Sequence, residues 1–409
     1  MTPSKRYLFI YGALLAPIAC LIYLNALFLY GIGEIRPVET IAREQQQNHG
    51  LYGSATHRLP YRYMLEIFSV RQPEVVAIGS SRVLQLSQSM FTTGFANLGQ
   101  TVNSLTEGRL LISDLIQRHQ PQLVLFGLDY WWFSENAHRP AGNFIHHRDA
   151  GDTLSFDTAF LPTQWLLEGK IPPAEFLKGL VYPSWLRPFA TYGMRAALYR
   201  EGLMPDGSYS YLGIQLGLRR ADDSRFADTL SRIAESRSFF QHCSNTNSER
   251  FADYEAILRT LRDAQIPVIT FLIPFAPTVQ NHMKAMNAAY GCIDLIRARL
   301  AAIALNNSDQ GYFDLFDSAA HGSDDCEFVD GFHGGSATTV RMLLKMIERP
   351  SSPLAHMVNR DALERLLAAS AGRTVLPEHP LLGREDREVD FLEIGCVRPF
   401  DTNEVRRGR

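Results

Sequence analysis

Three side chains that are far apart in the sequence have the chemistry of a serine-based acyl-transfer site. Ser81 follows a short apolar run, residues 74–78, whereas Asp330 and His333 lie in the segment Asp-Gly-Phe-His much later in the chain. A serine nucleophile needs an imidazole that accepts its proton, and the imidazole needs a carboxylate that fixes its tautomer. The spacing therefore predicts Ser81 as nucleophile, His333 as general base and Asp330 as the group that orients His333.

Each half of this pattern also has a simpler interpretation. Ser80 and Ser81 are residues that commonly cap the start of a helix. An Asp-x-x-His segment can occur in any surface loop. What favours chemistry is position, because Asp330 and His333 follow the last predicted strand and precede a helix expected to start near Ala337.

The elements expected to hold these residues alternate between strands and helices. Such alternation predicts an α/β protein whose parallel sheet is covered on both faces. Ligands of these sheets bind where the strands end, which is where Ser81 is expected. The predicted strands are 74–78, 95–97, 122–128, 266–273 and 312–316, and the predicted helices between and after them are 104–119, 249–264 and 278–304.

These segments resemble the SGNH, or GDSL-like, hydrolase superfamily. Gly79-Ser80-Ser81 is similar to the block that carries its nucleophile, and Asp330 with His333 is similar to its last block. Asn97-Leu98-Gly99 resembles the second block, which implies that the N–H groups of Gly99 and Ser81 form an oxyanion hole. The third block departs from the family, because Asp129 replaces an asparagine and an ionised carboxylate cannot donate a hydrogen bond.

The resemblance implies a three-layer α/β/α sandwich and a covalent acyl intermediate on Ser81. The pattern is most similar to the envelope-acylation branch, which includes the D-alanyl-transfer protein of teichoic acid synthesis and alginate O-acetylation proteins. It implies an acyltransferase or esterase that acts on an envelope or exported polysaccharide beside a membrane-bound O-acyltransferase, without a cofactor. The alternative is a non-catalytic protein that binds glycan or acts as a scaffold in such a complex.

Other residues are weaker candidates for binding. Arg82 is expected either to hold an anionic substrate group or to form a surface ion pair. Trp131 and Trp132 are suited to stack on sugar rings, although packing in the core is the more common use of such residues. The segment 146–149, His-His-Arg-Asp, has metal-binding residue types, but a solvated loop is the better interpretation, and we expect no metal site.

The N-terminal segment has the composition of a membrane span. No residue from Tyr7 to Gly33 is charged, and about 20 apolar residues cross a bilayer. The run is too long for a cleaved signal peptide, which favours an uncleaved anchor, although Cys20 leaves lipidation as an alternative. Lys5 and Arg6 precede the run, so we expect a cytoplasmic N-terminus and an extracytoplasmic catalytic domain.

The expected organisation follows from these patterns. Residues 1–33 form the anchor, 34–61 a polar stalk, and 62–349 one α/β domain. The proline- and aromatic-rich stretch at about 134–247 is expected to be an insertion over the sheet, such as a lid or docking surface. Residues 350–409 are expected to contain one helix, at about 360–371, and a charged tail.

Composition limits the classes of function. A formal net charge of −3 over 409 residues gives no basic footprint for nucleic acid, so we exclude nucleic-acid binding. Besides Cys20, four cysteines are present, and none has metal-ligand spacing. They allow three disulfide pairings or four free thiols, and the sequence does not choose between these states: Cys243, Cys292, Cys326 and Cys396.

Overall fold

The structure is a computed structural model of a mixed α/β protein with two compact units. Unit 1 comprises Met1–Arg58 and Asp149–Pro205, and unit 2 comprises Leu59–Arg148 and Asp206–Arg409. The expected insertion at 134–247 is therefore divided between the units instead of belonging to one domain. The segment 146–149 and the end of the charged tail, 397–409, lie outside the described residues, which are 3–56, 61–137, 156–305, 311–349, 351–375, 379–383 and 385–396.

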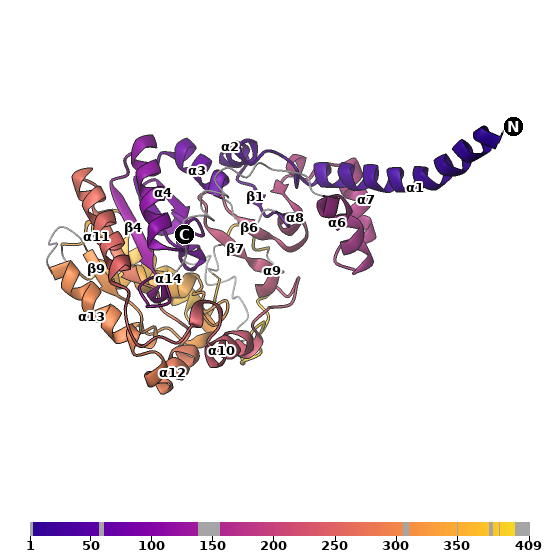
Figure 1. Cartoon of the computed structure of the whole chain (residues 1–409). Helices are drawn as coiled ribbons and strands as arrows, with labels where there is room; N and C mark the ends of the chain where they lie inside the picture. The colour runs from indigo at the N-terminus through magenta and orange to yellow at the C-terminus, as the bar shows by residue number, and fades with distance from the viewer. Residues whose placement is uncertain are drawn as a thin grey trace. The chain divides into compact units, whose positions relative to one another are not determined.

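Unit 2 contains a five-stranded parallel sheet (Figure 1). In register, Val75 lies opposite Phe95 on one side and Leu123 on the other. Strands that are buried on both faces are apolar throughout, which explains their runs of valine, leucine, isoleucine and phenylalanine. The predicted parallel sheet is confirmed, and its strands in spatial order are β3 (Phe95–Leu98), β2 (Val75–Ile78), β4 (Leu123–Leu128), β8 (Val268–Leu272) and β9 (Gly311–Asp314).

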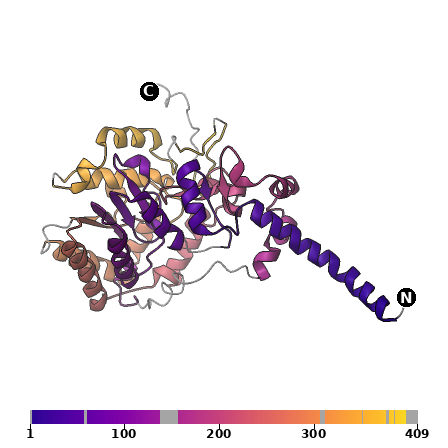
Figure 2. The same ribbon diagram turned by 90° about the horizontal axis from the view of Figure 1, so that it is seen from above.

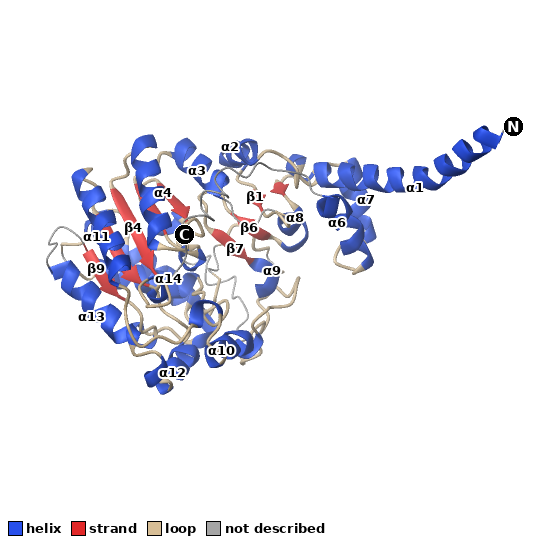
Figure 3. Cartoon of the chain, in the orientation of Figure 1, coloured by secondary structure: helices blue, strands red, loops and turns tan. Residues whose placement is uncertain are grey.

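Helices cover both faces of this sheet (Figure 3). On one face lie α14 (Ser336–Ile347) and the adjacent α15 (Arg360–Ser370) (Figure 2). These helices share a hydrophobic core with side chains of all five strands. On the other face, α4 (Leu105–Arg118) packs beside α11 (Ser248–Asp263), and the Tyr254 hydroxyl lies 2.9 Å from Thr270 Oγ1 of β8. α4 buries Leu111 and Leu115 of the face expected for helix 104–119, and α14 buries most of its residues.

The strand order places a topological switch point at β2. The chain leaves β2 for β3 on one side and later returns to β4 on the other side. In open parallel sheets this arrangement opens a crevice beyond the carboxyl ends of the central strands. Ser81 follows β2 and Asp129 follows β4, so both lie at this edge.

The other elements of unit 2 surround the sheet. One prediction was wrong here, because the expected helix 278–304 is two helices separated by a short turn. In this turn the Ala289 carbonyl accepts a hydrogen bond from the Cys243 N–H (2.8 Å), a contact from outside the helix. The elements are α3 (Tyr61–Arg71), β7 (Tyr209–Tyr211), α9 (Leu212–Gln215), α10 (Ala227–Ala234), α12 (Pro277–Ala285) and α13 (Cys292–Leu305).

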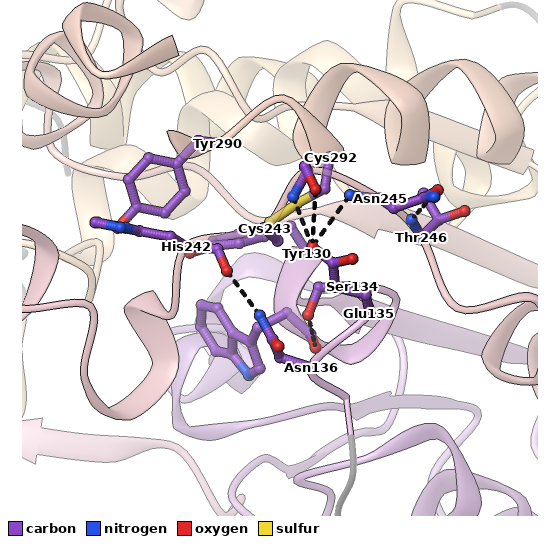
Figure 4. Close-up of a disulfide and its surroundings, with 12 residues drawn as sticks. Tyr130, Ser134, Glu135, Asn136, His242, Cys243, Asn245, Thr246, Tyr290 and Cys292 are labelled. Atoms are coloured by element: carbon purple, nitrogen blue, oxygen red, sulfur yellow. Dashed lines mark hydrogen bonds between the residues drawn. A yellow bond between two sulfur atoms is a disulfide. The ribbon is translucent and has the colours of Figure 1, made fainter. Parts of the chain in front are cut away.

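The four cysteines of unit 2 form two disulfides. Cys243 is bonded to Cys292 at the start of α13 (Figure 4), and Cys326 is bonded to Cys396. Cys20 is the free cysteine, and it is exposed on α1 (Pro3–Gly31). The structure thus selects one of the three pairings that the sequence left open.

Unit 1 is folded where the sequence predicted a polar stalk. Within 34–61, helix α2 (Val38–Asn48) buries Val38, Ile41 and Ala42, so an apolar face occurs among its glutamines. The helix α1 contains a stretch, Phe9–Gly31, long and apolar enough to cross a membrane. The other elements are β1 (Leu51–Tyr52), which pairs with β5 (Thr191–Tyr192) and β6 (Glu201–Leu203), and the helices α6 (Phe156–Leu167), α7 (Pro173–Val181) and α8 (Met194–Tyr199).

Candidate active site

A tight turn after β2 presents Ser81. A Cβ atom on Gly79 would lie 2.9 Å from Val83 Cγ1 and 3.1 Å from the Gly127 carbonyl oxygen, so this position requires glycine. Ser80 caps the short 3₁₀ helix η1 (Ser81–Val83), since its Oγ accepts a hydrogen bond from the Arg82 N–H (3.3 Å). The capping function considered for the serine pair thus belongs to Ser80, and the Ser81 hydroxyl points elsewhere.

Ser81, His333 and Asp330 form a continuous hydrogen-bonded series. Ser81 Oγ lies 2.8 Å from His333 Nε2, although the two residues are 252 positions apart. His333 Nδ1 lies 2.6 Å from Asp330 Oδ2. This is the geometry in which a histidine takes a proton from a serine while a carboxylate fixes its tautomer.

The turn that carries Asp330 and His333 is held by backbone donors. Asp330 Oδ1 accepts hydrogen bonds from the N–H groups of Phe332 (2.9 Å) and His333 (2.7 Å). Desolvation by itself raises the pKa of Asp330, but His333 and these two donors outweigh it and lower the pKa below the ordinary aspartate value. Asp330 therefore stays ionised, as a group that orients a histidine must.

His333 and Asp330 are partly accessible to solvent. The side chain of His333 is 14% exposed and that of Asp330 is 22% exposed. Both side chains can therefore be reached from solvent without unfolding of the turn.

Gly99 does not offer the free N–H that we expected. Its N–H is donated to Asn97 Oδ1 at 2.7 Å, so the second-block donor is occupied. The Asn97 amide in turn donates to the carbonyls of Val83 and Leu86, both at 2.8 Å. Asn97 is thus a residue that sequence reasoning missed as part of the site, although the expected strand 95–97 ended on it.

Arg82 and Asp129 form a buried ion pair. Arg82 Nη1 lies 2.7 Å from Asp129 Oδ1, and their side chains are 1% and 0% exposed. The expectation of a surface ion pair for Arg82 is therefore wrong, because the side chain turns inward beneath Ser81. Desolvation raises the pKa of Asp129, and the guanidinium opposes that rise.

The remaining contacts of Arg82 join separate segments of the site. Its Nε donates to the Phe332 carbonyl (2.8 Å), between Asp330 and His333. Its Nη2 donates to the carbonyls of Ile273 (3.1 Å) and Pro274 (2.5 Å), just after β8. The guanidinium of Arg82 therefore donates its hydrogen bonds to groups inside the protein. Arg82 holds segments of the site together and does not have the substrate-binding function that we considered.

Asp223 is a second supporting residue that the sequence did not indicate. Its Oδ2 accepts a hydrogen bond from the Gly331 N–H (2.9 Å) and another from the Thr229 hydroxyl (2.6 Å). Gly331 lies between Asp330 and His333, so Asp223 helps to fix the same turn. No motif marks this aspartate, because its partner is 108 positions away.

The two tryptophans after β4 differ in exposure. Trp132 is 3% exposed and packs near Phe126, as the core-packing interpretation expected, whereas Trp131 is partly exposed. Both line a pocket with about 440 Å³ of empty space, part of it open to solvent, together with Asn103, Ser238 and Arg250. Among the described residues, Trp132 Nε1 and Arg250 Nε are buried donors without an acceptor.

Histidine, cysteine, aspartate and glutamate are the side chains that commonly bind metal ions. No group of three or more such side chains in the described part of the chain is arranged to hold an ion.

No protein-family model matches the chain, and no curated protein sequence is significantly similar to it.

Proposed function

We propose that this protein is a membrane-anchored SGNH-like serine acyltransferase or esterase that acts on acyl esters of an envelope or exported polysaccharide. The observation that carries the proposal is the Ser81–His333–Asp330 series, with separations of 2.8 and 2.6 Å. The strand order β3-β2-β4-β8-β9 supports it as well, because this order places Ser81 at the switch point of the sheet.

The reaction proceeds in two acyl transfers. Ser81 Oγ attacks the acyl carbonyl while His333 Nε2 takes its proton, and the protonated histidine then gives that proton to the departing oxygen. This step leaves an acyl ester on Ser81. A second hydroxyl, from a sugar or from water, then attacks that ester, loses its proton to His333, and Ser81 is restored.

The oxyanion of each step needs a donor at the reacting carbon. We assign one donor to the Ser81 N–H, which makes no hydrogen bond within the described residues. The Gly99 N–H serves as a second donor only if it leaves Asn97 Oδ1. Asp129 supplies no donor while it is ionised and paired with Arg82.

A carbohydrate substrate is supported by the pocket beside Trp131. The loops after β3 and β4 form part of its lining, and β2 lies between these strands, so the pocket is at the Ser81 edge of the sheet. An indole face suits the apolar face of a sugar ring, and the partly exposed Trp131 offers such a face in this pocket.

Location and partners follow from the same proposal. Two disulfides are typical of an oxidising compartment, which supports a catalytic domain outside the cytoplasm and a cytoplasmic N-terminus. An acyl donor that starts in the cytoplasm must cross the bilayer, so we propose a membrane-bound O-acyltransferase as the partner.

Covalent labelling tests the proposal. A fluorophosphonate probe is expected to form one adduct on the wild-type protein, mapped to Ser81, and none on Ser81→Ala. Ser89→Ala is the matched control, because Ser89 is exposed and its Oγ contacts only Ser87 (2.9 Å). A folded wild-type protein without an adduct would favour the alternative, a non-catalytic glycan-binding or scaffold protein.

A further inference from the structure

Unit 1 leaves large apolar side chains exposed on the helix pair α6–α7. Leu167, at the end of α6, is 83% exposed, and Leu177 and Val181 of α7 are 62% and 83% exposed. Leu177 and Val181 are four positions apart, so they lie on one face of α7. Large apolar side chains left exposed in this way are typical of a surface that contacts a membrane or another molecule.

The opposite face of α7 packs on the end of α1. Phe176 stacks on Phe28, with 4.8 Å between the ring centroids. Gly31 and Gly179 make the closest approach, since a Cβ on Gly31 would lie within bonding range of the Gly179 carbonyl. The exposed face of α7 is therefore the face that points away from α1.

The helix α6 is joined to α1 by polar contacts as well. Asn25 Nδ2 donates to the Ala159 carbonyl (2.9 Å) and to Thr163 Oγ1 (2.8 Å). These bonds satisfy a side-chain amide near the end of an apolar helix, which would otherwise be costly in a bilayer. They fix α6 beside the last two turns of α1.

Those last turns mark the level at which α1 leaves its apolar stretch. Tyr23 and Tyr30 of α1 remain 62% and 56% exposed beside the pair. Three residues after Gly31, the Glu34 carboxylate accepts hydrogen bonds from Ser54 Oγ (2.6 Å) and from the N–H of Met194 (2.6 Å). The chain is thus inside a polar network within one helical turn of the end of α1.

We infer that α6 and α7 lie in the interface of the same bilayer that α1 crosses, with Leu167, Leu177 and Val181 among the lipid acyl chains. Lipid is the occupant that continuity favours, because this surface adjoins the exposed apolar side chains of α1. The charges of the pair fit an interfacial depth, since Glu168 is paired with Lys170 (2.6 Å) and Glu175 with Lys178 (3.3 Å). The inference rests on α1 as a membrane span.

Depth-dependent fluorescence quenching tests this arrangement in the full chain. The purified protein is reconstituted into vesicles of phosphatidylcholine and phosphatidylglycerol, and one cysteine at a time carries a bimane label. Cys20, which is free and exposed on α1, reports the span itself. In a Cys20→Ala background, Leu177→Cys and Val181→Cys report α7, and Gln47→Cys on α2 is the water-facing control of the same unit.

Brominated acyl chains are expected to quench the labels at positions 177 and 181 several-fold more than the label at 47. Aqueous iodide is expected to show the reverse order. If the Cys20 label is quenched by lipid but the labels at 177, 181 and 47 are quenched equally, the inference is overturned. Labels at 177 and 181 that become shielded only when a membrane protein is co-reconstituted would overturn it in favour of protein docking.

If the Cys20 label is not quenched by lipid, the failure lies in α1 as an anchor. Labelling of Ser81 by fluorophosphonate does not depend on either result, so the proposed chemistry is tested separately.

Discussion

The side chain of Arg82 connects three segments of the candidate site. It is adjacent to Ser81, pairs with Asp129 after β4, and donates to the Phe332 carbonyl in the turn that carries Asp330 and His333. Its guanidinium carbon also lies 4.1 Å from the centroid of the Phe275 ring. Arg82 is therefore a positioning residue, and its burial beneath the site makes the ion pair important for the fold.

A double-mutant cycle measures this pair. Asp129→Ala leaves a buried guanidinium without its counter-charge and is expected to lower the free energy of unfolding by about 3–5 kcal/mol. Arg82→Met is expected to cost a similar amount, and the double variant to cost clearly less than the sum. Denaturant unfolding of the detergent-solubilised chain gives these values, and strictly additive losses would show that the two residues do not act as a pair.

The lowered pKa of Asp330 gives a pH dependence of stability. A carboxyl whose pKa is lower in the folded than in the unfolded protein stabilises the fold above the unfolded value, taken as 3.8, and this contribution is lost as the pH falls through the folded value. We expect Asp330→Asn to be less stable than wild type at neutral pH, and the difference to shrink below pH 3.8. Thermal unfolding of both proteins at several pH values checks this, and a pH-independent difference would contradict it.

Among the elements, the end of β3 supports the nucleophile turn. Asn97, in β3, donates to the carbonyls of Val83 and Leu86 and accepts from the Gly99 N–H. The turn after β2 therefore depends on its neighbouring strand for its shape. This explains why Asn97 is fully buried although it is polar.

Removal of this amide is expected to loosen the turn. Asn97→Ala leaves the Leu86 carbonyl and the Gly99 N–H without a partner, at about 1–3 kcal/mol each in the free energy of unfolding, whereas the Val83 carbonyl keeps the Leu86 N–H (3.1 Å) as a donor. We expect slower labelling of Ser81 by the fluorophosphonate, measured as a rate constant on folded protein. Asn245→Ala is the control, because Asn245 is exposed. An unchanged labelling rate in Asn97→Ala would show that Asn97 does not support the site.

At the scale of the whole molecule, two disulfides constrain unit 2. The bond between Cys326 and Cys396 joins cysteines that are 70 positions apart in the sequence. The bond between Cys243 and Cys292 joins cysteines that are 49 positions apart. The chain-entropy argument gives about 4 kcal/mol of stabilisation for each loop of this length. Much of the stability of unit 2 thus depends on an oxidising compartment.

Differential alkylation tests this state. Protein extracted from membranes under acid trapping is expected to show one alkylated cysteine, Cys20, before reduction and all five afterwards. Mass spectrometry of the peptides gives the count. Alkylation of Cys326 and Cys396 before reduction would contradict the disulfide and weaken the proposal of an extracytoplasmic domain.

The sequence by itself determined the five strands of the parallel sheet, the apolar helix α1 and the edge at which the candidate site lies. Apolar runs bounded by glycine and polar residues identified the five strands, and the uncharged run identified α1, because these signals reside in neighbouring residues. The same pattern placed Ser81 and His333 after strands, and parallel strands end at one edge of their sheet. The positions of the strand ends thereby indicated that Ser81 and His333 lie close together. The catalytic functions of these two residues remain predictions, which the labelling experiment tests.

Tertiary structure alone decided which groups pair. The inward turn of Arg82 and the occupied N–H of Gly99 depend on packing around the nucleophile turn, to which no local pattern points. Helix α2 is another example. Its polar sequence 38–48 suggested a stalk, whereas Ile41 and its apolar neighbours are buried in the folded chain. The disulfide pairing has the same cause: the partners are 49 and 70 positions apart, and only the folded chain brings them into contact. Local periodicity encodes elements, whereas buried polar and covalent partners are set by contacts between residues distant in sequence.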